Sequence, residues 1–179
     1  MAGKLELIQV AIIGAGAMGS GIAQVAATAG HRVLLYDAKP GAAPGAIARI
    51  AQQLEKLVAK GKLSADAAAG IATRLVAIPN LNPITSAGLV LEVIVEEIEP
   101  KQKLLADIEA RVAPDCLLAT NTSSLSIPAI ARVLRAPQRL AGMHFFNPAP
   151  LMQLVEIVGG ITTDPAVLTA LDGLARAWG

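Results

Sequence analysis

Three side chains in the C-terminal half of the sequence could act on a substrate: Ser123, His144 and Glu156. His144 is the first candidate for proton transfer, because an imidazole can take up and return a proton near neutral pH. It comes late in a predicted strand, and Glu156 follows 12 residues later on the next one. In an antiparallel hairpin the carboxylate could meet the imidazole, fix its tautomer and stabilise the imidazolium that a general base becomes. Without this partner, His144 would be better interpreted as a buried structural histidine.

Ser123 lies in the polar run from Thr120 to Ser124, after a short predicted strand, and could hydrogen-bond a substrate oxygen. Ser124 and Ser126 compete with it, and each of the three could instead be a turn or cap residue. No G-x-S-x-G sequence surrounds them, so a nucleophilic serine is not indicated. The only other histidine, His31, starts a predicted strand, far from the carboxyl end of the strands where ligands of such sheets bind, and is interpreted as structural. One cysteine and two distant histidines suggest no metal site.

A glycine turn near the N-terminus predicts a second kind of chemistry. The apolar run 8–13 leads into Gly14-Ala15-Gly16-Ala17-Met18-Gly19, then a helical pattern to residue 29, then the run 31–36, which ends at Asp37. Asp37 lies 23 residues after the first glycine, near the spacing of about 20 that dinucleotide-binding βαβ units use. A glycine-rich turn of another α/β protein is the alternative, which the surrounding strands and helix disfavour.

Each part of this unit has a physical role in binding a dinucleotide. Gly14 permits the tight turn, Gly16 lets a pyrophosphate approach the backbone, and Gly19 lets the helix pack on the strands. The free N–H groups at the start of the helix attract the phosphates. Asp37 can accept both ribose hydroxyls and would repel a 2′-phosphate, which favours NAD over NADP. Lys39 slightly weakens that exclusion.

Alternating strand and helix patterns extend over the rest of the chain. Further strands are expected at 75–78, 89–95, 116–119, 139–146 and 153–158, and helices after Pro44, Ser64, Glu97, Ser126 and Asp164. The connection from Phe146 to Gln153 is too short for a helical crossover, so the last two strands should be antiparallel. The expected fold is a doubly wound, Rossmann-type α/β domain with a mostly parallel sheet of about seven or eight strands. Glu96 and Glu97 should lie at its carboxyl edge, where ligands bind.

Composition narrows the class of protein. At 179 residues the chain suits one domain, and a net charge of +1 gives no case for nucleic acid or an anionic membrane as partner. The single Cys116 fits a reducing compartment. Glu6 interrupts the apolar run after Lys4, so no signal peptide is expected and a cytoplasmic location follows. The glycines and polar residues between Val10 and Ala29 argue against a membrane span there.

Three segments together resemble the L-3-hydroxyacyl-CoA dehydrogenase family. They are Gly14 to Ala23, Asn121-Thr122-Ser123-Ser124-Leu125 and His144-Phe145-Phe146-Asn147-Pro148, in order and with the right gaps over nearly the whole chain. The 3-hydroxybutyryl-CoA enzymes and the 3-hydroxyadipyl-CoA enzymes of phenylacetate catabolism are the most similar types. The resemblance implies that His144 takes the proton from the 3-hydroxyl while hydride leaves for NAD, that Glu156 orients His144, and that Ser123 bonds the substrate.

The resemblance also assigns binding residues. It places Asp37 at the adenine ribose, Glu96, Lys101 and Asn147 near the rest of the NAD, and Gln53 and Lys60 at coenzyme A. From spacing alone, Lys60 would be interpreted as part of a solvated helix end. A lysine near an anionic phosphate nevertheless makes physical sense as a flexible point charge.

Members of the family continue into a helical C-terminal domain that closes the acyl cleft and usually forms a homodimer. Residues 1–179 therefore resemble the NAD-binding domain alone, for which binding of NAD without turnover is the expectation. Two alternatives are an NAD-binding module without turnover, as in the related lambda-crystallins, and a hydroxyacid dehydrogenase with a lysine base. Ser123, His144 and Glu156 together disfavour the first for the parent protein, and the His-Phe-Phe-Asn-Pro segment disfavours the second.

Overall fold

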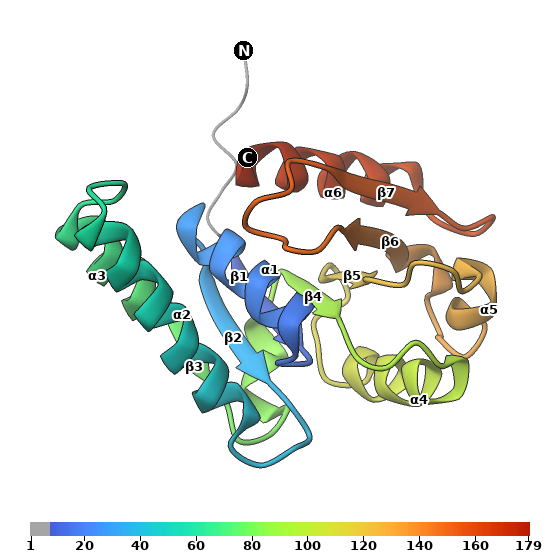
Figure 1. The fold of residues 1–179 in the computed structure, drawn as a ribbon. Helices are drawn as coiled ribbons and strands as arrows, with labels where there is room; N and C mark the ends of the chain where they lie inside the picture. The colour runs from blue at the N-terminus through green and yellow to red at the C-terminus, as the bar shows by residue number, and fades with distance from the viewer. Residues whose placement is uncertain (1–7) are drawn as a thin grey trace.

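Residues 8–179, which the computed structural model describes, form one seven-stranded sheet with helices on both faces (Figure 1). The segment with Lys4 and Glu6, on which the prediction about a signal peptide rests, lies outside the described residues. The strands are β1 Gln9–Ile13, β2 Arg32–Tyr36, β3 Leu75–Ala77, β4 Leu89–Glu92, β5 Leu117–Thr120, β6 Leu140–Phe145 and β7 Val155–Gly159. Their order is β3-β2-β1-β4-β5-β6-β7. Only β6 and β7 pair antiparallel within this sheet, which confirms the predicted doubly wound fold with an antiparallel end.

The strand order reverses between β1 and β4. From β1 the chain winds outward to β2 and β3, and it then returns to β4 and winds the other way to β5 and β6. The connections that leave β1 and β4 therefore diverge, which opens a crevice at the carboxyl ends of these two strands. This topology places a binding site at the residues that follow Ile13 and Glu92.

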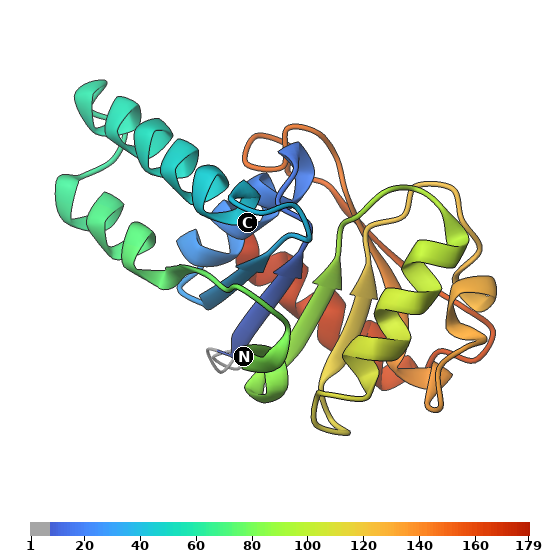
Figure 2. The same ribbon diagram turned by 90° about the horizontal axis from the view of Figure 1, so that it is seen from below.

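The helices are α1 Ala17–Thr28, α2 Ala42–Ala59, α3 Ala65–Arg74, α4 Ile98–Glu109, α5 Ile127–Ala131 and α6 Pro165–Trp178, with 3₁₀ turns η1 Asn82–Ser86 and η2 Pro137–Arg139. Three of them begin at the cap residues expected from the sequence: the side chains of Ser64, Ser126 and Asp164 accept backbone N–H groups of α3, α5 and α6. Figure 2 shows α2 and α3 lying side by side and extending beyond the β3 edge. No helix in the described range is long and apolar enough to cross a membrane.

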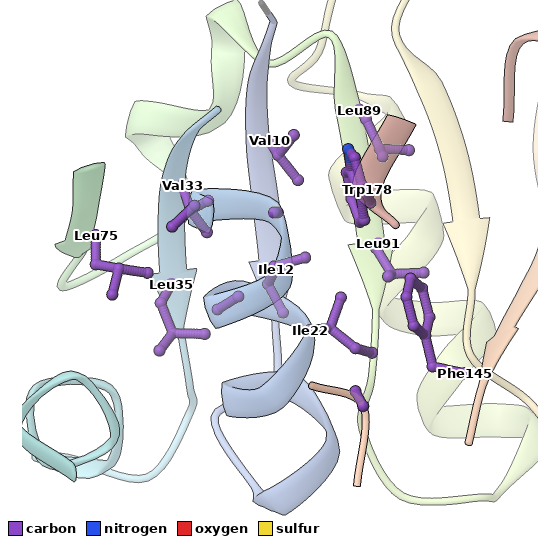
Figure 3. Packing of buried hydrophobic residues seen from close by; sticks show 14 of the residues in the cluster. Val10, Ile12, Ile22, Val33, Leu35, Leu75, Leu89, Leu91, Phe145 and Trp178 are labelled. Carbon is purple, nitrogen blue, oxygen red and sulfur yellow. The ribbon is translucent and has the colours of Figure 1, made fainter. Parts of the chain in front are cut away.

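Two apolar clusters cover the two faces of the sheet. On β1, Val10 and Ile12 face the cluster under α1, α2, α3 and α6, whereas Ala11 and Ile13 face the cluster under α4 and α5. Strands buried on both faces have nearly continuous apolar sequences, as β1 has from Val10 to Ile13. In the first cluster Trp178 of α6 stacks on Phe145 of β6 at a centroid distance of 6.0 Å (Figure 3). This contact packs α6 against the end of β6, next to His144 in the sequence.

The strand β4 is much shorter than expected. The apolar run 89–95 predicted a strand over its whole length, but β4 ends at Glu92. The chain turns there because the Ile94 N–H donates to the Glu92 carboxylate at 2.7 Å instead of to a neighbouring strand. Glu96 and Glu97 therefore lie in the connection to α4, and Glu97 is the N-cap residue of that helix. The last strand is shorter too, since β7 starts at Val155 and not at Gln153.

Candidate functional site: a dinucleotide crevice beside a histidine–carboxylate pair

The glycine turn between β1 and α1 is shaped for an anion. Gly14 has φ +118°, and a Cβ there would lie 2.2 Å from the carbonyl oxygen of Val93, so only glycine fits. A Cβ on Gly19 would lie 1.8 Å from the carbonyl oxygen of Gly14. Gly16 differs, because a Cβ there would meet nothing within 4 Å. Gly16 is also the N-cap of α1 and provides no side-chain cap, so the first N–H groups of the helix face an open space that phosphates can occupy.

Asp37 is held against this turn. Its Oδ2 accepts the Ala15 N–H at 2.7 Å and its Oδ1 accepts the Lys39 N–H at 2.8 Å. The adjoining pocket of about 580 Å³ is mostly apolar and is lined by Ile13, Gly14, Gly16, Tyr36, Asp37, Ala38, Val93, Ile94, Val95 and Leu104. An apolar slot with a carboxylate at its rim suits an adenosine. The fixed carboxylate keeps its outer lone pairs for ribose hydroxyls.

His144 and Glu156 meet as the sequence predicted. They are directly opposed in the antiparallel pairing of β6 and β7, and Nδ1 of His144 lies 2.8 Å from Oε2 of Glu156. Because an ionised carboxylate only accepts hydrogen bonds, Nδ1 carries the proton of the neutral ring and Nε2 has a free lone pair. The His144 ring also packs against Phe146 at a centroid distance of 4.7 Å. The contact with Glu156 therefore fixes the ring with Nε2 available to accept a proton.

The loop with Ser123 is tied to Glu96. Oε1 of Glu96 accepts the hydroxyl of Thr122, the Ser123 N–H at 2.9 Å and the Ser124 N–H at 3.2 Å. The Ser123 Oγ lies farther from the same oxygen, at 3.3 Å. Burial is the largest single influence on the Glu96 pKa and raises it, but the hydrogen bonds and Lys101 together lower the pKa to about 2. Glu96 is therefore ionised at neutral pH and fixes the loop through charge-assisted hydrogen bonds.

Behind Glu96 lies a buried ion pair that the sequence analysis did not predict. Glu92, at the end of β4, is fully buried, and its Oε1 accepts the Lys101 Nζ at 2.7 Å. Lys101 is 1% exposed and lies 3.4 Å from Oε2 of Glu96. The resemblance had placed Lys101 near the NAD, but its ammonium lies under Glu96 and contacts these two carboxylates. The one sequence signal for this ion pair was that Glu92 is charged and lies inside the otherwise apolar run 89–95.

A second pocket, of about 590 Å³, brings most of the predicted residues together. It is lined by Gly16, Ala17, Met18, Gly19, Val93, Ile94, Glu96, Asn121, Ser123, His144, Phe145, Phe146 and Asn147. It shares Gly16, Val93 and Ile94 with the pocket beside Asp37, so the two form one crevice at the switch point. Asn121 joins its two sides, since its Oδ1 accepts the Phe145 N–H at 2.8 Å. The crevice has the layout for an extended dinucleotide, with Asp37 at one end and His144 at the other.

The two residues that the resemblance assigns to coenzyme A do not line the same pocket. Gln53 lines a further pocket of about 660 Å³ between α1, α2 and the loop 147–151, and Arg49 and Lys56 line it as well. Lys60 is the C-cap of α2 and does not line this pocket. The sequence signal for this cationic helix face was the helical spacing of Arg49, Gln53 and Lys56. Among residues 8–179, no cluster of three or more His, Cys, Asp or Glu side chains could hold a metal ion.

Known proteins share this fold and much of this sequence. The family model described as "3-hydroxyacyl-CoA dehydrogenase, NAD binding domain" matches residues 9–179. A 3-hydroxyadipyl-CoA dehydrogenase of Escherichia coli is 45% identical over 95% of this chain, and a 3-hydroxybutyryl-CoA dehydrogenase of Bradyrhizobium diazoefficiens is 40% identical over 90%. The crystal structure of a 3-hydroxybutyryl-CoA dehydrogenase from Escherichia coli superposes with a TM-score of 0.95 at 44% identity, over 98% of this chain and 37% of that one.

The fold and the crevice define an NAD-binding domain of the Rossmann type. The chain belongs to the 3-hydroxyacyl-CoA dehydrogenase family, as its NAD-binding domain. It spans 36% of the length of the Escherichia coli relative and 55% of that of the Bradyrhizobium relative.

Proposed function

We propose that the protein oxidises L-3-hydroxyacyl-CoA thioesters to 3-oxoacyl-CoA with NAD. The observation that carries this proposal is the His144–Glu156 pair, whose imidazole lines the same pocket as the first turn of α1 and Ser123. An oriented base beside a dinucleotide crevice is what oxidation of an alcohol needs. The relatives named above are dehydrogenases of 3-hydroxyacyl-CoA compounds, which supports this substrate class.

In this proposal each catalytic side chain moves or holds one proton. His144 Nε2 takes the proton of the 3-hydroxyl, and Glu156 stabilises the imidazolium through Nδ1. Ser123 donates a hydrogen bond to the substrate oxygen, for which its hydroxyl must leave the 3.3 Å contact with Glu96. The Ser123 N–H can stay on Glu96 meanwhile, so the loop keeps its position. NAD, when bound, supplies the acceptor for the hydride from C3.

The proposed cofactor residues follow the crevice. The turn from Gly14 to Gly19 would hold the pyrophosphate and Asp37 the adenine ribose. Glu96, Asn147 and Ser123 would lie near the nicotinamide half, with Lys101 acting from beneath Glu96. The open space at Gly16 and the uncapped start of α1 fit the phosphates.

Coenzyme A is proposed to bind along α2. Gln53 and Lys60 are the residues that the family resemblance implies, and Arg49 and Lys56 add positive charge beside Gln53. This pocket shares Ala17 and Asn147 with the pocket at His144, so a thioester could reach the base from it.

We further propose that the protein acts in the degradation of acyl-CoA compounds, by β-oxidation or phenylacetate catabolism, in the cytoplasm. A homodimer is proposed for the complete enzyme, with no nucleic-acid or membrane partner.

The alternative, an NAD-binding module without turnover, is not favoured for the gene product because the relatives are named as enzymes. Residues 1–179 alone are proposed to bind NAD and to depend on a C-terminal helical domain for turnover. The test is reduction of NAD by the intact gene product with short, long and dicarboxylic 3-hydroxyacyl-CoA substrates. Reduction of NAD with one class identifies the acyl group. If the gene product binds NAD but reduces it with none of these substrates, the result would support the NAD-binding module without turnover.

A further inference from the structure

Glu92 is a buried carboxylate with a full set of partners. It stands at the end of β4 and is 0% exposed. Its Oε1 accepts the Lys101 ammonium and the Ile94 N–H, both at 2.7 Å, and its Oε2 accepts the Thr120 hydroxyl at 2.7 Å. A charge so deeply buried is costly unless it is paired and hydrogen-bonded, and Glu92 is both.

Lys101 connects this buried carboxylate to the surface of the crevice. Its ammonium contacts Glu92 at 2.7 Å and Glu96 at 3.4 Å, so it lies between two carboxylates and closer to the buried one. Glu96 uses its other oxygen for the loop with Ser123. The chain of contacts therefore runs from β4 through α4 to the loop after β5.

We propose that Glu92 is a positioning residue for the Ser123 loop, acting through Lys101 and Glu96. The Glu92 carboxylate holds the Lys101 ammonium back from Glu96, and this leaves Glu96 free to accept the N–H groups of the loop. The part of the proposal that concerns turnover rests on the proposed function of Ser123. The part that concerns the position of the loop does not depend on it.

The direction of the effect follows from the charges. Without the Glu92 charge, Glu96 is the one carboxylate left beside the buried ammonium among the described residues. Lys101 then moves toward Glu96 and draws its carboxylate away from the loop, because a buried ammonium without a counter-charge is unfavourable. The Ser123 and Ser124 N–H groups lose part of a charge-assisted hydrogen bond, and the Ser123 hydroxyl moves relative to His144.

The variant Glu92→Gln tests this with little change of shape. The glutamine oxygen can still accept the Ile94 N–H, and its NH₂ can donate to the Thr120 hydroxyl, which rotates to accept. We expect amide hydrogen exchange at Ser123 and Ser124 to become about tenfold faster, the size of one weakened hydrogen bond to a charged group, and exchange in β1 to stay unchanged. The matched control is Glu99→Gln, since Glu99 is exposed in α4 and its side chain makes no hydrogen bond or ion pair within residues 8–179.

Turnover of acetoacetyl-CoA by the intact gene product gives the second readout. We expect kcat of Glu92→Gln to fall about ten- to a hundredfold with little change in the Kd of NADH. In a Ser123→Ala background the same substitution should have almost no further effect on kcat, because the two changes act through one hydroxyl. Glu92→Asp keeps the charge on a shorter side chain, so its changes in amide exchange and kcat should have the same sign as those of Glu92→Gln but be smaller. It replaces Glu92→Gln in the test if that variant does not fold.

Two results would overturn the proposal. One is unchanged exchange at Ser123 and Ser124 in a folded Glu92 variant. The other is an effect on kcat that simply multiplies with that of Ser123→Ala. A wild-type protein that shows no turnover while the exchange responds as expected would instead contradict the proposed function and leave the positioning role standing.

Discussion

Nδ1 of His144 lies 2.8 Å from Oε2 of Glu156, and the two residues are directly opposite in the only antiparallel strand pair of the described sheet. The register alone makes them neighbours, because opposed residues of an antiparallel pair project to the same face. Glu156 is half exposed, so the contact adds little to stability. Its effect is on the orientation and tautomer of His144.

Replacing His144 by glutamine should therefore slow the oxidation of the substrate without weakening the binding of NADH. We expect His144→Gln to lower kcat of the intact gene product about 10²- to 10⁴-fold, the usual contribution of a general base. Binding of NADH, followed by its fluorescence, should stay within about twofold of wild type, because the phosphate and ribose sites are elsewhere in the crevice. An equal loss of NADH affinity would mean that His144 belongs to the cofactor site.

The sequence predicted this pair because both determinants are local. The loop between the two strands is too short for a crossover, and the apolar alternation fixes which side chains share a face. The cap residues Ser64, Ser126 and Asp164 were predictable for the same reason, since a cap acts within three residues of its own position.

The end of β4 and the buried ion pair were not predictable in this way. Val93, Ile94 and Val95 are apolar because they line the pocket beside Asp37, yet in the sequence they only lengthen an apolar run. The partner of Glu92, Lys101, lies nine residues away across a turn and the start of α4. Neither periodicity nor a local motif connects the two residues; only the folded connection from β4 to α4 does.

Two glycines of the turn should respond differently to alanine. At Gly16 the backbone is not left-handed and an added Cβ meets no protein atom, so Gly16→Ala should keep the unfolding temperature and weaken NADH binding at least about tenfold by crowding the phosphates. At Gly19 the added Cβ would lie 1.8 Å from the Gly14 carbonyl oxygen, so Gly19→Ala should lose about 1–3 kcal/mol of stability, or more. Thermal unfolding and NADH titration of both variants make the comparison. Equal NADH affinity in Gly16→Ala and wild type would place the phosphates elsewhere.

Asp37 should decide between the two nicotinamide cofactors. In Asp37→Ser the repulsion of a 2′-phosphate is gone, while a hydroxyl remains to accept the Ala15 N–H. We expect the Kd of NADH to rise about tenfold and that of NADPH to fall, with Lys39 now favouring the extra phosphate. Paired titrations with NADH and NADPH measure the ratio. An unchanged ratio would show that Asp37 does not contact the ribose.

Glu96 makes stability depend on pH in the acid range. Its pKa of about 2 in the folded protein lies below the ordinary value of 4.5, since the hydrogen bonds from Thr122 and the following N–H groups, together with Lys101, outweigh the opposite effect of burial. A lowered carboxyl pKa stabilises the fold above pH 4.5, and this contribution is lost as pH falls from 4.5 to about 2. Glu96→Gln should therefore lower the urea midpoint at neutral pH and have little effect near pH 2. The exposed Glu99→Gln is the control, and a Glu96→Gln deficit that persists at pH 2 would refute the charge as its cause.

Cys116 should be unreactive in the folded protein. It is buried just before β5, and burial raises the pKa of its thiol to about 11, an effect that the nearby Arg139 opposes and Asp115 reinforces. Compared with an ordinary value of 9.0, the thiolate fraction near neutral pH falls about a hundredfold, and access is blocked as well. Labelling with a chromogenic disulfide at about pH 8 should therefore be slow in the native protein and fast in concentrated guanidinium. The Ser123 loop follows the other end of β5. Rapid labelling of the native protein would therefore mean that this strand opens readily, which would contradict a fixed position of the loop.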